Sequence, residues 1–248
     1  METGEIILLI GGGLLAGTAN TLAGGGSLLT VPLLVLLGLP GGIANGTNRL
    51  GVLVQCLTAA GSFRSLGVSE YSAAGRVIVP LASGSVIGAV AISRIPDAAF
   101  ERSFGVVMLL LLVPTYLHRS SPRTGGPTVA AWSPRRSWWM FVLIGVYAGA
   151  FQAGVGVLLL LSLSHAGFDL VRANAVKVVI VAASAAVSLP VFIAEDQIAW
   201  LPAGVLALGL AGGGALGARL AVHGGERVIR PVLAVAVIGL ALGMLGGF

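Results

Sequence analysis

Polar side chains that could bind an anion recur at matching spacings within an otherwise apolar sequence. Asn45, Asn48 and Arg49 stand at positions i, i+3 and i+4, so a helix would place them on one face. Asn174 and Lys177 occupy the positions of Asn45 and Asn48 in a second stretch 129 residues later. Amide and cationic N–H groups donate to anion oxygens, and charge-assisted hydrogen bonds are about twice as strong as neutral ones. These residues are therefore candidate substrate-binding residues.

The same residue types have alternative uses. An asparagine can cap the start of a helix, and a lysine or arginine can extend its charged group to the membrane surface. Two further amides, Asn20 and Gln152, precede glycine-rich stretches. They are candidates for donating to a ligand, or for hydrogen bonds that tie the local chain together. The sequence leaves both alternatives open at each of these positions.

Glycine interrupts two apolar segments directly after these amides. The candidate ligand-binding residues within the interruptions are Gly24, Gly25, Gly26, Ser27, Gly154 and Gly156. Glycine permits the positive φ of a tight reversal, and helices that restart after each break would direct their positive N-terminal ends at it, which favours an anion. The alternative is close helix packing. We expect packing for Gly13, Gly17, Gly84, Gly88, Gly145, Gly149, Gly213 and Gly217.

The composition indicates a protein that lies in a lipid bilayer. Of its 248 residues 56% are hydrophobic and only 9% are charged, whereas soluble domains contain about 25% charged residues. We therefore expect a polytopic membrane protein. There is no basic face with interleaved aromatic side chains, so we expect no binding to nucleic acid. The sequence contains no HExxH, paired histidine ligands, CxxC or P-loop, so we expect no cofactor, no metal and no enzymatic activity.

The chain divides into two similar halves around a polar linker. Residues 1–117 and 138–248 are mostly apolar, and residues 118–137 form a basic linker rich in Pro, Gly and Ser. From Asn45 onward, matching stretches keep one offset of 129 residues, as in "IANGTN" and "RANAVK" or "GSVIGA" and "GGALGA". Chance would not hold one offset across separate motifs, so we infer an internal duplication into two transmembrane repeats.

The first apolar segment of each half is expected to be a broken or re-entrant hairpin. Residues 5–39 would form one helix of about 52 Å, which is too long for a bilayer core of about 30 Å, yet they are too few for two full crossings. If both hairpins return to their starting side, 11 Lys and Arg residues lie inside and 3 lie outside, in agreement with the positive-inside rule. Both termini are then outside, and the linker is cytoplasmic.

Each half then continues with an odd number of crossings, so the two halves are inserted in opposite senses. The expected fold is an all-α polytopic membrane protein of two inverted repeats. Each repeat is a broken or re-entrant helical hairpin followed by three transmembrane helices. Inverted repeats are typical of secondary transporters, and the hairpin tips would approach the bilayer midplane from opposite faces.

At these residues the sequence resembles the sulfite exporter TauE/SafE family, also called the toluene sulfonate uptake permease family. The resemblance covers essentially the whole chain and rests on "GLLAGTANTLAGGGSLLTVPLLVLLGLPGGIANGTNRLG" and its second copy "GVYAGAFQAGVGVLLLLSLSHAGFDLVRANAVKVV". The second copy departs from the first by having Val155 within the glycine stretch and no equivalent of Pro32. The resemblance implies a multi-pass transporter of the bacterial inner membrane that moves small sulfur-containing anions such as sulfite, sulfoacetate or other organosulfonates.

We expect export of such an anion by alternating access around a midplane site. Outward movement of an anion runs with an inside-negative potential and needs no coupling carboxylate, and no apolar segment has a central Asp or Glu. Three alternatives stay open: an anion channel, a proton- or sodium-coupled anion uptake permease, and a membrane assembly factor without transport activity. A homodimer is one assembly compatible with the sequence.

Overall fold

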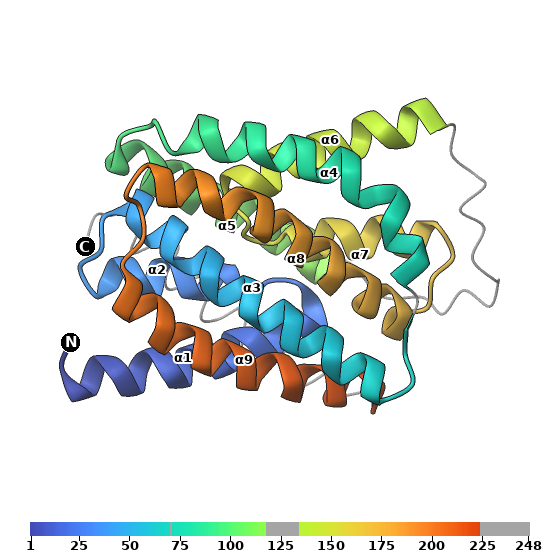
Figure 1. Cartoon of the computed structure of the whole chain (residues 1–248), viewed down its shortest axis with the longest axis horizontal. Helices are drawn as coiled ribbons and strands as arrows, with labels where there is room; N and C mark the ends of the chain where they lie inside the picture. The colour runs from blue at the N-terminus through green and yellow to red at the C-terminus, as the bar shows by residue number, and fades with distance from the viewer. Residues whose placement is uncertain (70, 118–133, 224–248) are drawn as a thin grey trace.

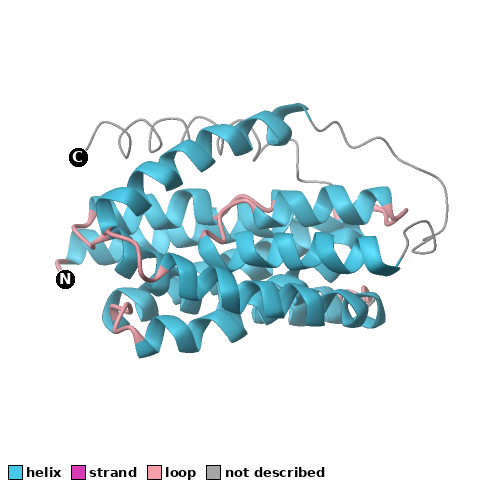
Figure 2. Ribbon diagram, turned by 90° about the horizontal axis from the view of Figure 1, so that it is seen from above, coloured by secondary structure: helices cyan, strands magenta, loops and turns pink. Residues whose placement is uncertain are grey.

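The computed structural model describes residues 1–69, 71–117 and 134–223, and every regular element in these ranges is an α-helix (Figures 1 and 2). The helices are α1 (Thr3–Ala23), α2 (Ser27–Leu36), α3 (Gly41–Ser65), α4 (Tyr71–Ile92), α5 (Asp97–Leu117), α6 (Pro134–Ala150), α7 (Val155–His165), α8 (Leu170–Ala194) and α9 (Trp200–Val222).

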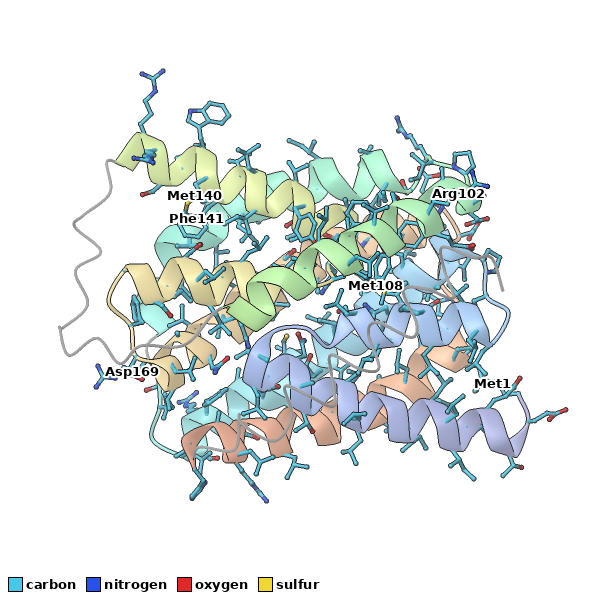
Figure 3. The ribbon with its side chains drawn as sticks, turned by 180° about the vertical axis from the view of Figure 1, so that it is seen from behind. Met1, Arg102, Met108, Met140, Phe141 and Asp169 are labelled. Atoms are coloured by element: carbon cyan, nitrogen blue, oxygen red, sulfur yellow. The ribbon has the colours of Figure 1, made fainter. Side chains whose placement is uncertain are left out.

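The helices run back and forth along the long axis of the molecule, so most of their connections lie at its two ends (Figure 1). At the end that carries the N-terminus, the Gly42 amide donates to Asp97 Oδ1 at 2.8 Å, which joins the first turns of α3 and α5. The α3–α4 and α7–α8 connections lie at the opposite end. Figure 3 shows Met1 and Arg102 at the first end and Asp169 at the second.

The described helices have an apolar outer surface. Ile7 on α1, Val79 on α4, Leu110 on α5 and Leu208 on α9 are each at least 60% exposed. Three of the described helices, α1, α8 and α9, are long and apolar enough to cross a membrane. Polar side chains such as Arg49 are buried inside instead. This distribution suits a bilayer, which solvates apolar side chains and not polar ones.

Two helix pairs, α1–α2 and α6–α7, reverse the chain within the bundle where the sequence predicts breaks (Figure 1). α1 ends at Ala23 because Gly24 adopts a left-handed conformation with φ 85°. In the second pair Gln152, with φ 57°, and Gly154, with φ 66°, turn the chain into α7. α1 starts at the N-terminal end of the molecule and α6 at the opposite end, so the two turns approach each other from opposite directions.

Glycines allow α1 to lie against α9 and α6 to lie against α4. A Cβ atom on Gly17 would lie 2.6 Å from the Leu210 carbonyl oxygen, and one on Gly84 would lie 2.8 Å from the Val146 nitrogen. The close approach confirms the packing function that the sequence predicts for the glycines of both helix pairs. The glycines that meet a neighbouring helix in this way are Gly13, Gly17, Gly84, Gly88, Gly145, Gly149, Gly213 and Gly217.

The structure moves one element boundary. α6 begins at Pro134, so the last four residues of the expected linker, residues 134–137, are helical. Proline is well suited to the first position of a helix, because its fixed φ is already helical and it lacks an N–H that would be unpaired there. The rest of the linker and the last expected segment, residues 228–247, lie outside the described residues.

Candidate functional site

Arg49 of α3 holds the C-terminal end of α6. Its Nη1 donates to the Ala148 carbonyl at 2.8 Å, and its Nη2 donates to the carbonyls of Gly149 and Ala150, the latter at 3.2 Å. Asn45, one turn earlier on the same face, donates through Nδ2 to the Ala150 carbonyl at 2.8 Å. The expected polar face of α3 therefore exists, and it points at the end of another helix.

The C-terminal end of α6 attracts a cation for a physical reason. The last four carbonyls of a helix have no partner within the helix, and they carry the negative end of its dipole. α6 ends at Ala150, so the carbonyls that Arg49 contacts belong to this unpaired set. The planar guanidinium can serve several of them at once. The ring of Phe192 also covers the cation, with its centroid 4.9 Å from Arg49 Cζ.

Lys177 of α8 holds the C-terminal end of α1 in the corresponding way. Its Nζ donates to the carbonyls of Asn20 and Thr21 at 2.8 and 2.9 Å and to Asn174 Oδ1 at 2.6 Å. Asn174 Nδ2 donates to the Leu22 carbonyl at 3.3 Å. An ammonium has three N–H donors, and these three acceptors match them. The protein itself therefore satisfies Lys177 in this conformation.

The two alternatives considered for these residues are excluded by their positions. Arg49 and Lys177 are 0% and 2% exposed, so neither extends to the membrane surface. Asn45 and Asn174 lie inside α3 and α8 and not at their N-caps, which are Pro40 and Asp169. All four side chains act between helices.

Asn20 ties the first hairpin together. Its Nδ2 donates to Gln55 Oε1 at 2.6 Å, and its Oδ1 accepts from the Gly26 amide at 3.4 Å. Gln55 Nε2 donates in turn to Thr21 Oγ1 at 2.8 Å. Both polar atoms of the Asn20 amide are thus paired inside the protein, which is the tying function that the sequence left open.

The tips of the two hairpins touch each other through their main chains. A Cβ atom on Gly24 would lie 2.5 Å from the Val157 nitrogen and 2.6 Å from Gly156 Cα. Only glycine allows this approach, so Gly24 and Gly156 have a packing function here. Ser27 is buried at the first position of α2, so the N-terminal end of α2 lies beside this contact.

Several buried polar atoms on α3 and on the second hairpin have no hydrogen-bond partner in the described part of the chain. They are Asn45 Oδ1, Asn48 Nδ2, Arg49 Nε, Gln152 Nε2 and Gln152 Oε1. Asn45 and Arg49 lie beside the second hairpin, because both donate to the Ala150 carbonyl and Gln152 follows two residues later. Asn48 lies one turn from Asn45 on the same face of α3. Buried polar groups without a partner are rare, so this cluster is the best candidate for contact with a ligand.

The two hairpins differ because their neighbours differ. Asn20 is paired by Gln55 of α3, whereas the position that corresponds to Gln55 in the second half, 129 residues later, is Ser184 of α8. Serine is too short to reach in the same way, and Ser184 Oγ lies 2.8 Å from Ser85 Oγ instead. Gln152 is therefore left without the partner that Asn20 has.

Comparison with known proteins identifies the family of the chain. The sequence profile described as "Sulfite exporter TauE/SafE" matches residues 9–244. The chain belongs to this family. It is accordingly a multi-pass membrane transporter and not an enzyme.

Bacterial relatives of this TauE/SafE chain are named as probable membrane transporter proteins, without a substrate. A probable membrane transporter protein of Haemophilus influenzae is 28% identical over 229 residues, which cover 90% of this chain and 88% of that protein. One of a Sinorhizobium species is 26% identical and covers 93% of this chain and 88% of its own length. Probable membrane transporter protein YfcA of Escherichia coli is 27% identical and covers 90% and 82%. No solved structure matches the chain significantly.

Two partners of the TauE/SafE site could not be found from sequence patterns. Thr30 of α2 donates through Oγ1 to Asn48 Oδ1 at 2.6 Å, and Phe192 lies over Arg49. Threonine and phenylalanine are ordinary residues of apolar helices, so neither has a local signal. The helix-end carbonyls that Arg49 and Lys177 contact are main-chain atoms, which no residue type identifies.

Proposed function

We propose that the chain exports a small sulfur-containing anion, such as sulfite, sulfoacetate or another organosulfonate, by alternating access around one buried anion site. The observation that carries this proposal is the cluster of unpartnered atoms on Asn45, Asn48, Arg49 and Gln152 within the described structure. Three of these residues offer N–H donors. An anion bound among them would pair groups that are otherwise costly to bury.

The predicted residues divide into three groups in this proposal. Asn45, Asn48, Arg49 and Gln152 contact the anion. Lys177, Asn174 and Asn20 position the first hairpin and add their charge and dipoles from a distance. The residues of the two tips form the boundary that separates the anion from each side of the membrane; these are Gly24, Gly25, Gly26, Ser27, Gly154 and Gly156.

The two halves of the chain act as inverted repeats in this proposal. Residues 1–117 form the first, residues 138–248 the second, and residues 118–137 connect them at the cytoplasmic side. Support comes from the opposite directions of the two hairpins and from the exchange of contacts between halves, since α3 holds the end of α6 and α8 holds the end of α1. Alternating access would shift these two hairpin ends relative to each other.

Export is the favoured direction in the inner membrane. Moving one negative charge outward gains about 2.3 kcal/mol per 100 mV of inside-negative potential. With both termini outside, the basic residues Arg64 and Arg219 lie toward the cytoplasm, in agreement with the positive-inside rule. The site itself offers amide and cationic donors and no carboxylate, which suits an anion that moves without a coupled proton.

Efflux from proteoliposomes tests the proposal. Purified protein is reconstituted with sulfite or sulfoacetate inside, and a potassium diffusion potential of about 100 mV, negative inside, is imposed. We expect saturable efflux that the potential accelerates. Replacement of Arg49 by lysine, which lacks the planar fork, should slow efflux at least about tenfold, whereas Arg172→Lys, at an exposed side chain, should not.

Other results would identify the alternatives. Ion currents far above transporter turnover would indicate a channel, and inward movement that needs a proton or sodium gradient would indicate a coupled uptake permease. If no sulfur anion binds to the protein or is moved by it, the proposal is contradicted and an assembly factor is favoured.

A further inference from the structure

The Gln152 side chain is the least satisfied group of the candidate site. It is 4% exposed, and neither its Oε1 nor its Nε2 has a partner among the described residues. It lies in a left-handed conformation in a turn fixed on both sides. The Phe151 amide donates to the Tyr147 carbonyl at 2.9 Å, and the Tyr147 hydroxyl donates to the Ala153 carbonyl at 2.5 Å.

The unpartnered atoms at this site include acceptors as well as donors. Gln152 supplies one of each, and this remains true whichever way its amide is oriented. Asn45 Oδ1 is a second acceptor, because the hydrogen bond from Asn45 Nδ2 to the Ala150 carbonyl fixes the orientation of that amide. The donors are Asn48 Nδ2, Arg49 Nε and Gln152 Nε2.

A simple oxyanion would satisfy only part of this set. Its oxygens accept from the donors, but they have nothing to give to the amide oxygens, which would stay buried and unpaired beside a negative charge. A buried site that is built to accept a hydrogen bond discriminates strongly against a ligand that lacks the donor.

We propose that the anion carried by this site also bears its own O–H or N–H donor, which binds Gln152 Oε1 while the anionic oxygens bind Arg49 and Asn48. Hydroxyalkanesulfonates, aminoalkanesulfonates and hydrogensulfite belong to this class. Sulfoacetate, whose two acid groups are both ionised at neutral pH, has no such donor and should bind more weakly. The proposal rests on the anion site of the proposed function and adds a requirement on its ligand.

Two anions of nearly equal size and equal charge test this requirement. Binding of ethanesulfonate and 2-hydroxyethanesulfonate to the purified full chain in lipid nanodiscs is measured by isothermal titration calorimetry. We expect ethanesulfonate to bind about 5- to 150-fold more weakly, the equivalent of one unsatisfied buried acceptor. Gln152→Met should reduce this preference to about twofold. Gln197→Met, at the end of the molecule near Ser93, is the control and should leave it unchanged.

The outcomes separate this requirement from the site itself. Equal affinities in the unmodified protein would overturn the donor requirement and leave the anion site standing, as a water molecule bound at Gln152 would predict. A hydroxyl preference that persists in Gln152→Met would also overturn it. Binding of neither anion, together with no binding of sulfite or sulfoacetate, would overturn the proposed function as well.

Discussion

Lys177 in α8 donates a hydrogen bond of 2.8 Å to the main-chain oxygen of Asn20 in α1. Arg49 in α3 makes the corresponding contact of 2.8 Å to the main-chain oxygen of Ala148 in α6. Each buried cation therefore holds the end of a hairpin that belongs to the other half of the chain. The position of each hairpin tip depends on residues of both halves.

Removal of the Lys177 charge should destabilise the protein. In Lys177→Met the Thr21 carbonyl and Asn174 Oδ1 lose their donor, whereas the Asn20 carbonyl keeps the Gly24 amide, and each unsatisfied buried group costs about 1–3 kcal/mol. Thermal unfolding in detergent should show a melting temperature several degrees lower, by the usual relation between such a loss and Tm. Arg172→Met on the same helix removes an exposed cation, and surface ion pairs contribute about 0–1 kcal/mol. Equal melting temperatures for the two variants would contradict the holding role of Lys177.

A side chain at the contact of the two tips should block function. A Cβ on Gly156 would lie 2.9 Å from the Gly24 carbonyl oxygen and nearer still to its Cα, so Gly156→Ala must push the hairpins apart. We expect anion efflux to fall at least about tenfold, because a misplacement of about 1 Å can cost up to about 100-fold where groups must be aligned. Gly11→Ala, with no atom near its Cβ position, is the control. Unchanged efflux in Gly156→Ala would show that the tips do not meet during transport.

Replacement by alanine should affect the melting temperature differently at two glycines of the packed helices. A Cβ on Gly88 of α4 would lie 2.8 Å from the Val146 carbonyl carbon, so Gly88→Ala should separate α4 from α6 and lower the melting temperature. Gly204 of α9 has open space at its Cβ position, so Gly204→Ala should leave the melting temperature unchanged or raise it, because alanine favours helix by about 1 kcal/mol. An unchanged melting temperature in Gly88→Ala would argue against the close α4–α6 contact.

The orientation in the membrane can be read from two exposed positions at helix ends. In a Cys56→Ala background, Ser65→Cys at the end of α3 should be cytoplasmic, and Glu195→Cys after α8 should face outside. The reason is the excess of basic residues on the side of the protein where α3 ends, which the positive-inside rule assigns to the cytoplasm. An impermeant thiol reagent added to intact cells should label only position 195. Labelling of position 65 from outside would reverse the orientation.

The helices and the polar face of α3 could be predicted because their signals are local. Glycine stretches break the apolar segments, and Asn45, Asn48 and Arg49 share a face through the helical repeat alone. The partners of that face could not be predicted. They are main-chain carbonyls at the end of α6, about a hundred residues away in the sequence, as in the Arg49 to Ala148 contact.

The difference between the hairpins was also beyond the sequence. Asn20 and Gln152 are both amides that precede a glycine break, and their roles look alike in the one-dimensional pattern. Only the packing of α3 and α8 shows that Gln55 reaches Asn20, whereas Gln152 has no partner within the described residues. Whether a buried amide is paired depends on the length of the partner side chain and on the position of the helix that carries it.

The contrast between Asn20 and Gln152 gives the most direct test of the anion site. Thermal unfolding is measured with and without the anion that stabilises the unmodified protein most among sulfite, thiosulfate, sulfoacetate and 2-hydroxyethanesulfonate. Gln152→Met removes unpaired buried atoms, so we predict an unchanged or higher melting temperature without anion and a clear loss of the anion-induced increase. Asn20→Leu breaks the bond to Gln55, so we predict a lower melting temperature that the anion still raises. An anion-induced increase that survives in Gln152→Met and disappears in Asn20→Leu would place the site at the other hairpin and contradict the account.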